Sequence, residues 1–161
     1  MVIKVGRDEY TIEFTFEASL YGECIEKVIA FMSAIPENGT ADEIKHFITS
    51  LSDIPSTTLT MFYAGLMEHH GEDGDGTVTS KKDAKAILRA YIEENRDNED
   101  GTFYAVMEKM IEQMGEDGFF DRIGLTKILS TEEPKKPKTP QDHKKKTTTT
   151  KKASVSVVGE K

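Results

Sequence analysis

Strict alternation of apolar and polar positions marks the first sixteen residues. An apolar run at 2–5 is followed by a polar turn at 6–9. Apolar side chains then occupy every second position: Tyr10, Ile12, Phe14 and Phe16. Two runs of this kind around a polar turn predict a β-hairpin with one buried face. Because a lone hairpin is marginal in water, we expect this face to pack on other elements.

The rest of the chain up to residue 129 shows the spacing of amphipathic helices. Apolar residues recur at three and four positions, which places them along one helix face. The helices expected from this spacing cover 17–35, 41–51, 55–70, 81–92, 103–114 and, less regularly, 119–129. Segments 40–43 and 80–83 have the form of capping boxes, and Pro36, Pro55 and Gly71 mark helix ends.

This pattern predicts a mainly α fold of the α+β class. An N-terminal β-hairpin packs on a bundle of five to six amphipathic helices, and together they form one domain over 1–130. Residues 131–161 contain prolines, lysine clusters and a threonine run but almost no large apolar side chain. Such a segment cannot build a core, so we expect a disordered Lys/Thr/Pro-rich tail.

Charge divides the chain in the same place. Residues 1–130 carry 12 basic and 25 acidic side chains, whereas 131–161 carry 9 and 4. An acidic domain disfavours binding to nucleic acid or to anionic membranes, so such contacts would fall to the tail. No apolar run approaches the roughly 18 residues of a membrane span, and Cys24 is the only cysteine. We therefore expect a cytoplasmic protein that contacts neither membrane nor nucleic acid.

The acidic, glycine-rich segment 71–82 resembles the calcium-binding loop of an EF-hand. That loop needs oxygen ligands at positions 1, 3, 5 and 12 and a glycine at position 6. With Asp73 and Asp75 at positions 3 and 5, Gly71 falls at position 1 and Lys82 at position 12. Two carboxylates are then missing, and the lysine would repel the ion.

A shifted frame fails as well. With Asp73 at position 1, Thr77 stands at position 5 and Val78 replaces the required glycine. We therefore reject a metal site at Asp73, Asp75 and Thr77 and expect an acidic turn there. A small acidic helical binding module, linked to calcium through this degenerate loop, remains the alternative function.

No other group of residues points to catalysis. His69 and His70 are adjacent on a predicted helix and therefore point about 100° apart, which disfavours a shared metal ion. Cys24 lies on an apolar helix face, where a core role is expected. The methionine-rich helix 103–114 also has core spacing, although methionines can form an adaptable binding face. We expect no enzyme activity and no cofactor.

Several segments resemble the tail assembly chaperones of siphophages and prophages of Gram-positive bacteria. These segments are Val2–Gly6, Glu9–Phe14, Phe16–Tyr21, Thr57–Leu66, Asp83–Lys85 and Pro140–His143. The resemblance spans nearly the whole chain and consists of similar short sequence segments rather than a catalytic signature.

The resemblance implies a function in virion assembly. Proteins of this family act in the host cytoplasm, bind the helical tape measure protein, keep it soluble and help the major tail protein to polymerise around it. They are not part of the mature virion. A longer form often arises by ribosomal frameshifting, for which Lys144–Lys146 would supply an A-rich codon run. The resemblance assigns no contact residues, and self-association stays open.

Overall fold

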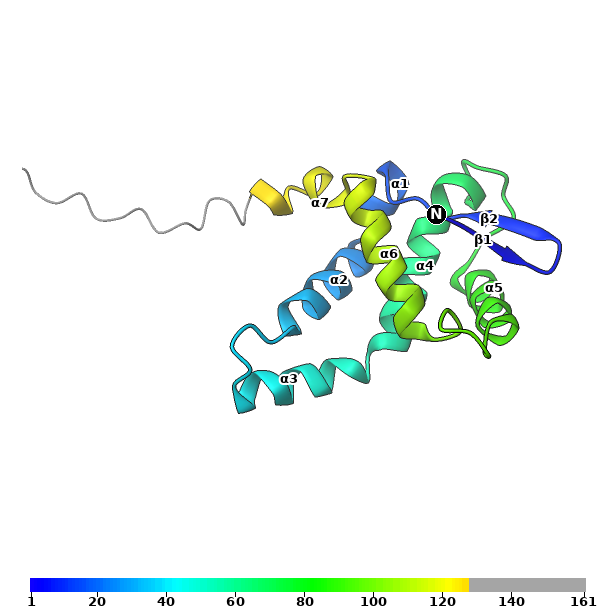
Figure 1. Cartoon of the computed structure of the whole chain (residues 1–161). Coiled ribbons are helices and arrows are strands. Elements are labelled where there is room, and N and C mark those ends of the chain that lie inside the picture. Colours follow the sequence, from blue (N-terminus) through cyan, green and yellow to red (C-terminus); the bar gives the residue numbers. More distant parts are fainter. Residues whose placement is uncertain (128–161) are drawn as a thin grey trace, which may run out of the picture.

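The computed structural model describes residues 1–127 (Figure 1). Strands β1 (Val2–Val5) and β2 (Asp8–Thr11) form an antiparallel hairpin at the N-terminus. The helices that follow are α1 (Phe16–Ser19), α2 (Gly22–Ala34), α3 (Ala41–Leu51), α4 (Ile54–His70), α5 (Lys81–Glu94), α6 (Phe103–Glu116) and α7 (Phe119–Arg122). The mainly helical fold with an N-terminal hairpin is confirmed. The predicted tail, including Pro140–His143 and Lys144–Lys146, and the end of the last predicted helix lie outside the described residues.

Helix α4 lies at the centre of the molecule. It contacts α1, α2, α5, α6 and β2. Buried side chains occur on all its sides, which is expected of a helix surrounded by neighbours. At Gly65 the hairpin segment comes so close that a Cβ atom would lie 2.6 Å from Ile12 Cγ2. The missing side chain therefore lets the N-terminal segment pack directly on the α4 backbone.

The hairpin is shorter than the alternating pattern predicts. Its turn consists of Gly6 and Arg7, with Gly6 in the left-handed region at φ 61°. The expectation that the second strand runs to Phe16 is wrong, because β2 ends at Thr11 and only Ile12 continues the backbone pairing, with Met1. Ile12 and Phe14 are nevertheless fully buried, as the alternation predicts. Phe16 instead begins α1 and is 59% exposed.

The segment between β2 and α1 is held by two carboxylates. Asp117, just after α6, accepts the Phe14 backbone N–H at 2.7 Å. Glu68 on α4 accepts the Thr15 hydroxyl at 2.7 Å and the Glu17 N–H at 3.2 Å. These bonds replace a strand partner, so the apolar alternation continues without β-structure.

A single helix over 17–35 is also a wrong prediction. The chain breaks at Leu20 and Tyr21, which separate α1 from α2. Tyr21 turns inward onto Tyr63 of α4, with ring centroids 5.4 Å apart in an edge-on arrangement. Leu20 is left 61% exposed. Spacing alone could not reveal this break, because the apolar positions on its two sides stay in phase.

Most of the other helix boundaries agree with the sequence signals, but the helix predicted over 119–129 is interrupted after Arg122, and Gly124 lies in the left-handed region at φ 78°. At the start of α3, the Thr40 side chain and the Glu43 side chain form the predicted capping box. Ser80 caps α5 by accepting the Asp83 N–H. The Asp83 carboxylate does not complete the box, because it accepts hydrogen bonds from the Thr79 N–H, the Thr79 hydroxyl and the Ser80 hydroxyl. No helix among residues 1–127 is long and apolar enough to cross a membrane.

Candidate functional site

In the EF-hand-like loop, the carboxylate of Asp75 is hydrogen-bonded to neighbouring groups of the protein itself. Asp75 Oδ1 accepts the backbone N–H and the hydroxyl of Thr77 at 2.9 and 2.6 Å. Asp75 Oδ2 lies 2.8 Å from Nδ1 of His70. Hydrogen bonds from Thr77, and then from His70, lower the pKa of Asp75 to about 2. The carboxylate that would be a calcium ligand thus stabilises a turn.

His70 extends this network to the hairpin. Its Nε2 accepts the Thr11 N–H at 2.9 Å, so the ring proton lies on Nδ1 and is donated to Asp75. The Tyr10 ring packs edge-on against the imidazole at 5.4 Å. A single buried side chain therefore joins β2, the end of α4 and the loop that follows.

The remaining predicted ligands lie apart. His69 bonds through Nε2 to Glu13 at 2.6 Å, on a different side from Asp75. Asp73 makes no hydrogen bond or ion pair with another side chain in the part of the chain that the structure describes. Within that part, no three His, Cys, Asp or Glu side chains gather closely enough to hold a metal ion.

Cys24 and the methionines of α6 are core residues, as the sequence predicts. Cys24 is fully buried, and burial raises the pKa of its thiol to about 12, which leaves it unreactive at neutral pH. Met107, Met110 and Met114 are fully buried on the inner face of α6. The methionine-rich helix therefore offers no adaptable outer face.

The feature that stands out is the orientation of α3. Its pattern places Ile44, Phe47, Ile48 and Leu51 on one face, which would ordinarily be the buried face. In the structure Phe47 is half-buried, whereas Ile44, Ile48 and Leu51 are 44%, 60% and 39% exposed, and α3 buries none of its residues. We call these three residues the α3 stripe. The stripe is an amphipathic helix face without a partner among the described residues.

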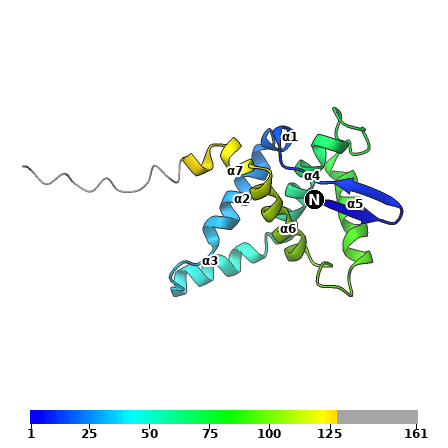
Figure 2. The ribbon, with the colours of Figure 1, turned by 45° about the horizontal axis from the view of Figure 1, so that its top comes forward.

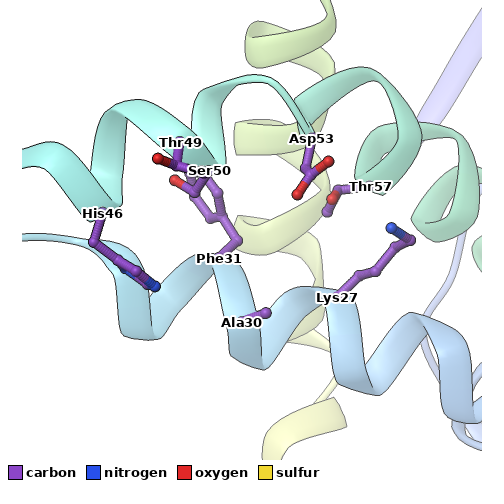
Figure 3. Close-up of a pocket in the computed structure, with 8 residues that line it drawn as sticks. All are labelled: Lys27, Ala30, Phe31, His46, Thr49, Ser50, Asp53 and Thr57. Atoms are coloured by element: carbon purple, nitrogen blue, oxygen red, sulfur yellow. The ribbon is translucent and has the colours of Figure 1, made fainter.

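A polar groove lies on the other side of α3 (Figure 3). His46, Thr49 and Ser50 of α3 face Ala30 and Phe31 of α2 across this groove, which encloses about 180 Å³. Each residue turns a helix by about 100°, so the α3 stripe lies roughly opposite these polar side chains. Helix α3 thus turns polar side chains toward the groove, although His46 and Thr49 stay exposed, and leaves the α3 stripe open to solvent. The groove is smaller than the roughly 300 Å³ at which small-molecule sites begin, so we do not assign it a ligand.

Helix α2 adds further exposed apolar side chains. Ile29, Met32 and Ile35 are 36%, 39% and 51% exposed. Helices α2 and α3 lie on the side of the molecule away from the β-hairpin and α5 (Figure 2). Segment 35–53 carries four acidic side chains and one lysine. The α2–α3 pair is therefore an acidic surface with apolar rows.

This arrangement suits the binding of another helix. Exposed apolar rows on a helix pair can take an amphipathic helix whose own apolar face needs cover. The acidic side chains around them favour a partner with lysine or arginine beside its apolar positions. None of these residues could be assigned as a contact residue from the sequence alone. The α3 spacing shows that its apolar residues share a face, but not in which direction that face points.

Comparison of the chain with models of protein families, with curated proteins and with solved structures found no match. The resemblance to tail assembly chaperones therefore remains a hypothesis based on the residues themselves.

Proposed function

We propose that this chain is a phage tail assembly chaperone without enzyme activity. In this role it binds the tape measure protein in the cytoplasm of the bacterial host and keeps that protein soluble. It also assists polymerisation of the major tail protein and stays out of the mature virion.

The α3 stripe is the observation that supports this proposal best. A tape measure protein exposes long apolar helical faces before assembly, and a chaperone must offer apolar surface to cover them. Ile44, Ile48 and Leu51 offer such a surface, and it is already formed in the folded chain. The excess of acidic side chains on residues 1–130 keeps the chaperone soluble through self-repulsion while this surface is open. The segments that resemble known chaperones point to the same function.

The direct test is co-expression with the tape measure protein encoded by the same phage or prophage. We expect the full chain to co-purify with this partner and to move it from the insoluble to the soluble fraction. A tape measure protein that stays insoluble and unbound would refute the chaperone function.

A pair of matched variants locates the interaction. Ile48→Glu places a charge in the α3 stripe, whereas Val2→Glu places the same charge at a β1 side chain of similar exposure, 60% against 58%. Neither side chain is buried, so both variants should fold. We expect Ile48→Glu to reduce recovery of the tape measure protein about tenfold, as for a central interface residue, and Val2→Glu to leave it unchanged. Equal recovery with both variants would show that the partner binds elsewhere.

A further inference from the structure

An apolar groove lies on the α5 side of the molecule. It encloses about 440 Å³ between the first turns of α4, the outer side of α5 and the start of α6. Its apolar wall consists of Pro55, Leu59, Leu88, Ile92 and Phe103. Phe103 is 38% exposed, although it is a large aromatic side chain at a helix start. We call this site the α4–α6 groove.

The groove is formed by fixed elements. Thr58 is fully buried, and its hydroxyl lies 2.8 Å from the Ile54 carbonyl and 3.1 Å from the Phe103 carbonyl. These contacts hold the start of α6 against α4. Thr102 caps α6 by accepting the Ala105 N–H at 3.1 Å. A preformed groove loses little conformational entropy when an occupant binds.

The charge beside the groove is opposite to that of the molecule. Lys85 and Arg89 line it, and neither forms an ion pair within residues 1–127. Glu93, the acidic residue of the lining, bonds to Arg96 at 3.2 Å and is partly neutralised. The domain as a whole has a large acidic excess. Lys85 and Arg89, which have no ion-pair partner within residues 1–127, therefore favour a partner that carries carboxylates beside its apolar side chains.

We propose that the α4–α6 groove docks an amphipathic helix of another protein that presents bulky apolar side chains flanked by carboxylates. The apolar side chains would cover Leu59, Ile92 and Phe103, while the carboxylates would pair with Lys85 and Arg89. This preference is the reverse of that of the α2–α3 pair, whose surroundings are acidic. The inference concerns a separate surface and does not depend on the proposed chaperone function.

The test uses two synthetic peptides and the full chain. Both peptides are amphipathic helices of about five turns, or about 18 residues, with leucine and phenylalanine along one face. One carries glutamate on its flanks and the other carries lysine at the same positions. We expect fluorescence anisotropy to show binding of the glutamate peptide to this groove and its weakening by salt.

Two pairs of variants assign the binding to the groove. Arg89→Glu is matched by Arg122→Glu on α7, which makes the same change of charge on a surface away from α5 (Figure 1). Phe103→Ala is matched by Phe16→Ala, which removes an equally large and more exposed ring from α1. We expect Arg89→Glu and Phe103→Ala each to weaken the glutamate peptide about tenfold and the two control variants to stay within about twofold of the unchanged chain.

Three results would overturn the proposal. Equal affinity of the groove variants and their controls would mean that the peptide binds elsewhere. If Arg89→Glu weakened binding of the lysine peptide as much as binding of the glutamate peptide, the groove would have no preference for carboxylates. Sedimentation that finds an oligomer of the unchanged chain, dissociated by Arg89→Glu, would identify the occupant as a second copy instead of another protein. Because none of these measurements involves the tape measure protein, they are distinguishable from failure of the chaperone function.

Discussion

Gly65 is the residue at which α4 approaches the N-terminal segment most closely. Its carbonyl accepts the Glu13 N–H at 2.9 Å, and an added Cβ would lie 2.6 Å from Ile12 and 2.9 Å from Phe14. Both neighbours are fully buried and cannot move aside without disturbing the core. In the sequence, Gly65 looks like an unfavourable residue inside a helix, and only the packing explains it.

Gly65→Ala should therefore destabilise the fold. We expect a loss of about 1–3 kcal/mol, typical of overpacking in a well-packed core. Gly115→Ala is the matched control, because this helical glycine has no atom within 4 Å of the added Cβ. Its free energy of unfolding should rise by about 0.5–1 kcal/mol as the helix gains propensity. Urea unfolding of both variants measures the difference, and equal effects would contradict the close contact.

Asp75 makes stability depend on pH. Its pKa falls from 3.8 to about 2 in the folded chain, because Thr77 and His70 bond to the ionised form. This contribution is complete above the unfolded pKa and is lost as the pH falls through the folded pKa.

The difference in melting temperature between the unchanged chain and Asp75→Asn should therefore shrink as the pH drops from above 3.8 toward about 2. Asp73→Asn, which removes a carboxylate without side-chain bonds in the described part, is the control. If the difference in melting temperature does not change with pH, Asp75 contributes through the shape of its side chain and not through its charge.

At the scale of elements, the sequence predicts where most helices begin but not where they face. Thr40 and Glu43 define the start of α3 because capping is local chemistry, and the structure has the same box. The orientation of the α3 stripe depends on which side of the helix meets α2, and no local signal contains that information. The docking surface could therefore be predicted as a helix face but not as an exposed one.

Loss of the α3 cap should have a local effect. Thr40→Ala removes the side-chain half of the capping box, in which Thr40 Oγ1 accepts the Glu43 N–H, at a cost of about 1 kcal/mol to the helix. Because α3 buries no residue, we expect faster amide hydrogen exchange in α3 with little change in global melting temperature. Global destabilisation as large as the local one would mean that α3 is part of the cooperative core.

At the scale of the whole molecule, two surfaces with opposite charge preference flank one core. The overall acidic excess was visible in the sequence, but it concealed the cations at Lys85 and Arg89. Counting charges along the chain could not show that these two side chains lie beside Phe103, because the groove joins three separate helices.

Calcium separates the two candidate functions at this scale. A ligand at about 100 times its Kd adds about 2.7 kcal/mol to the stability of the folded state, which would raise the melting temperature by several degrees. With Asp75 bonded to Thr77 and His70, we expect calcium to give the same melting temperature as a potassium salt of equal ionic strength. A calcium-specific rise that disappears in Asp75→Asn would favour the calcium-linked binding module.

The bond between Phe14 and Asp117 sets an order of events during synthesis. These residues are 103 positions apart, so a ribosome adding about 5–20 residues per second makes the acceptor about 5–20 s after the donor. Until Asp117 leaves the ribosome, the segment that contains Phe14 lacks both the Asp117 carboxylate and the helix α6 that covers it in the folded chain. The N-terminal hairpin is therefore made among the first elements and reaches its final place among the last.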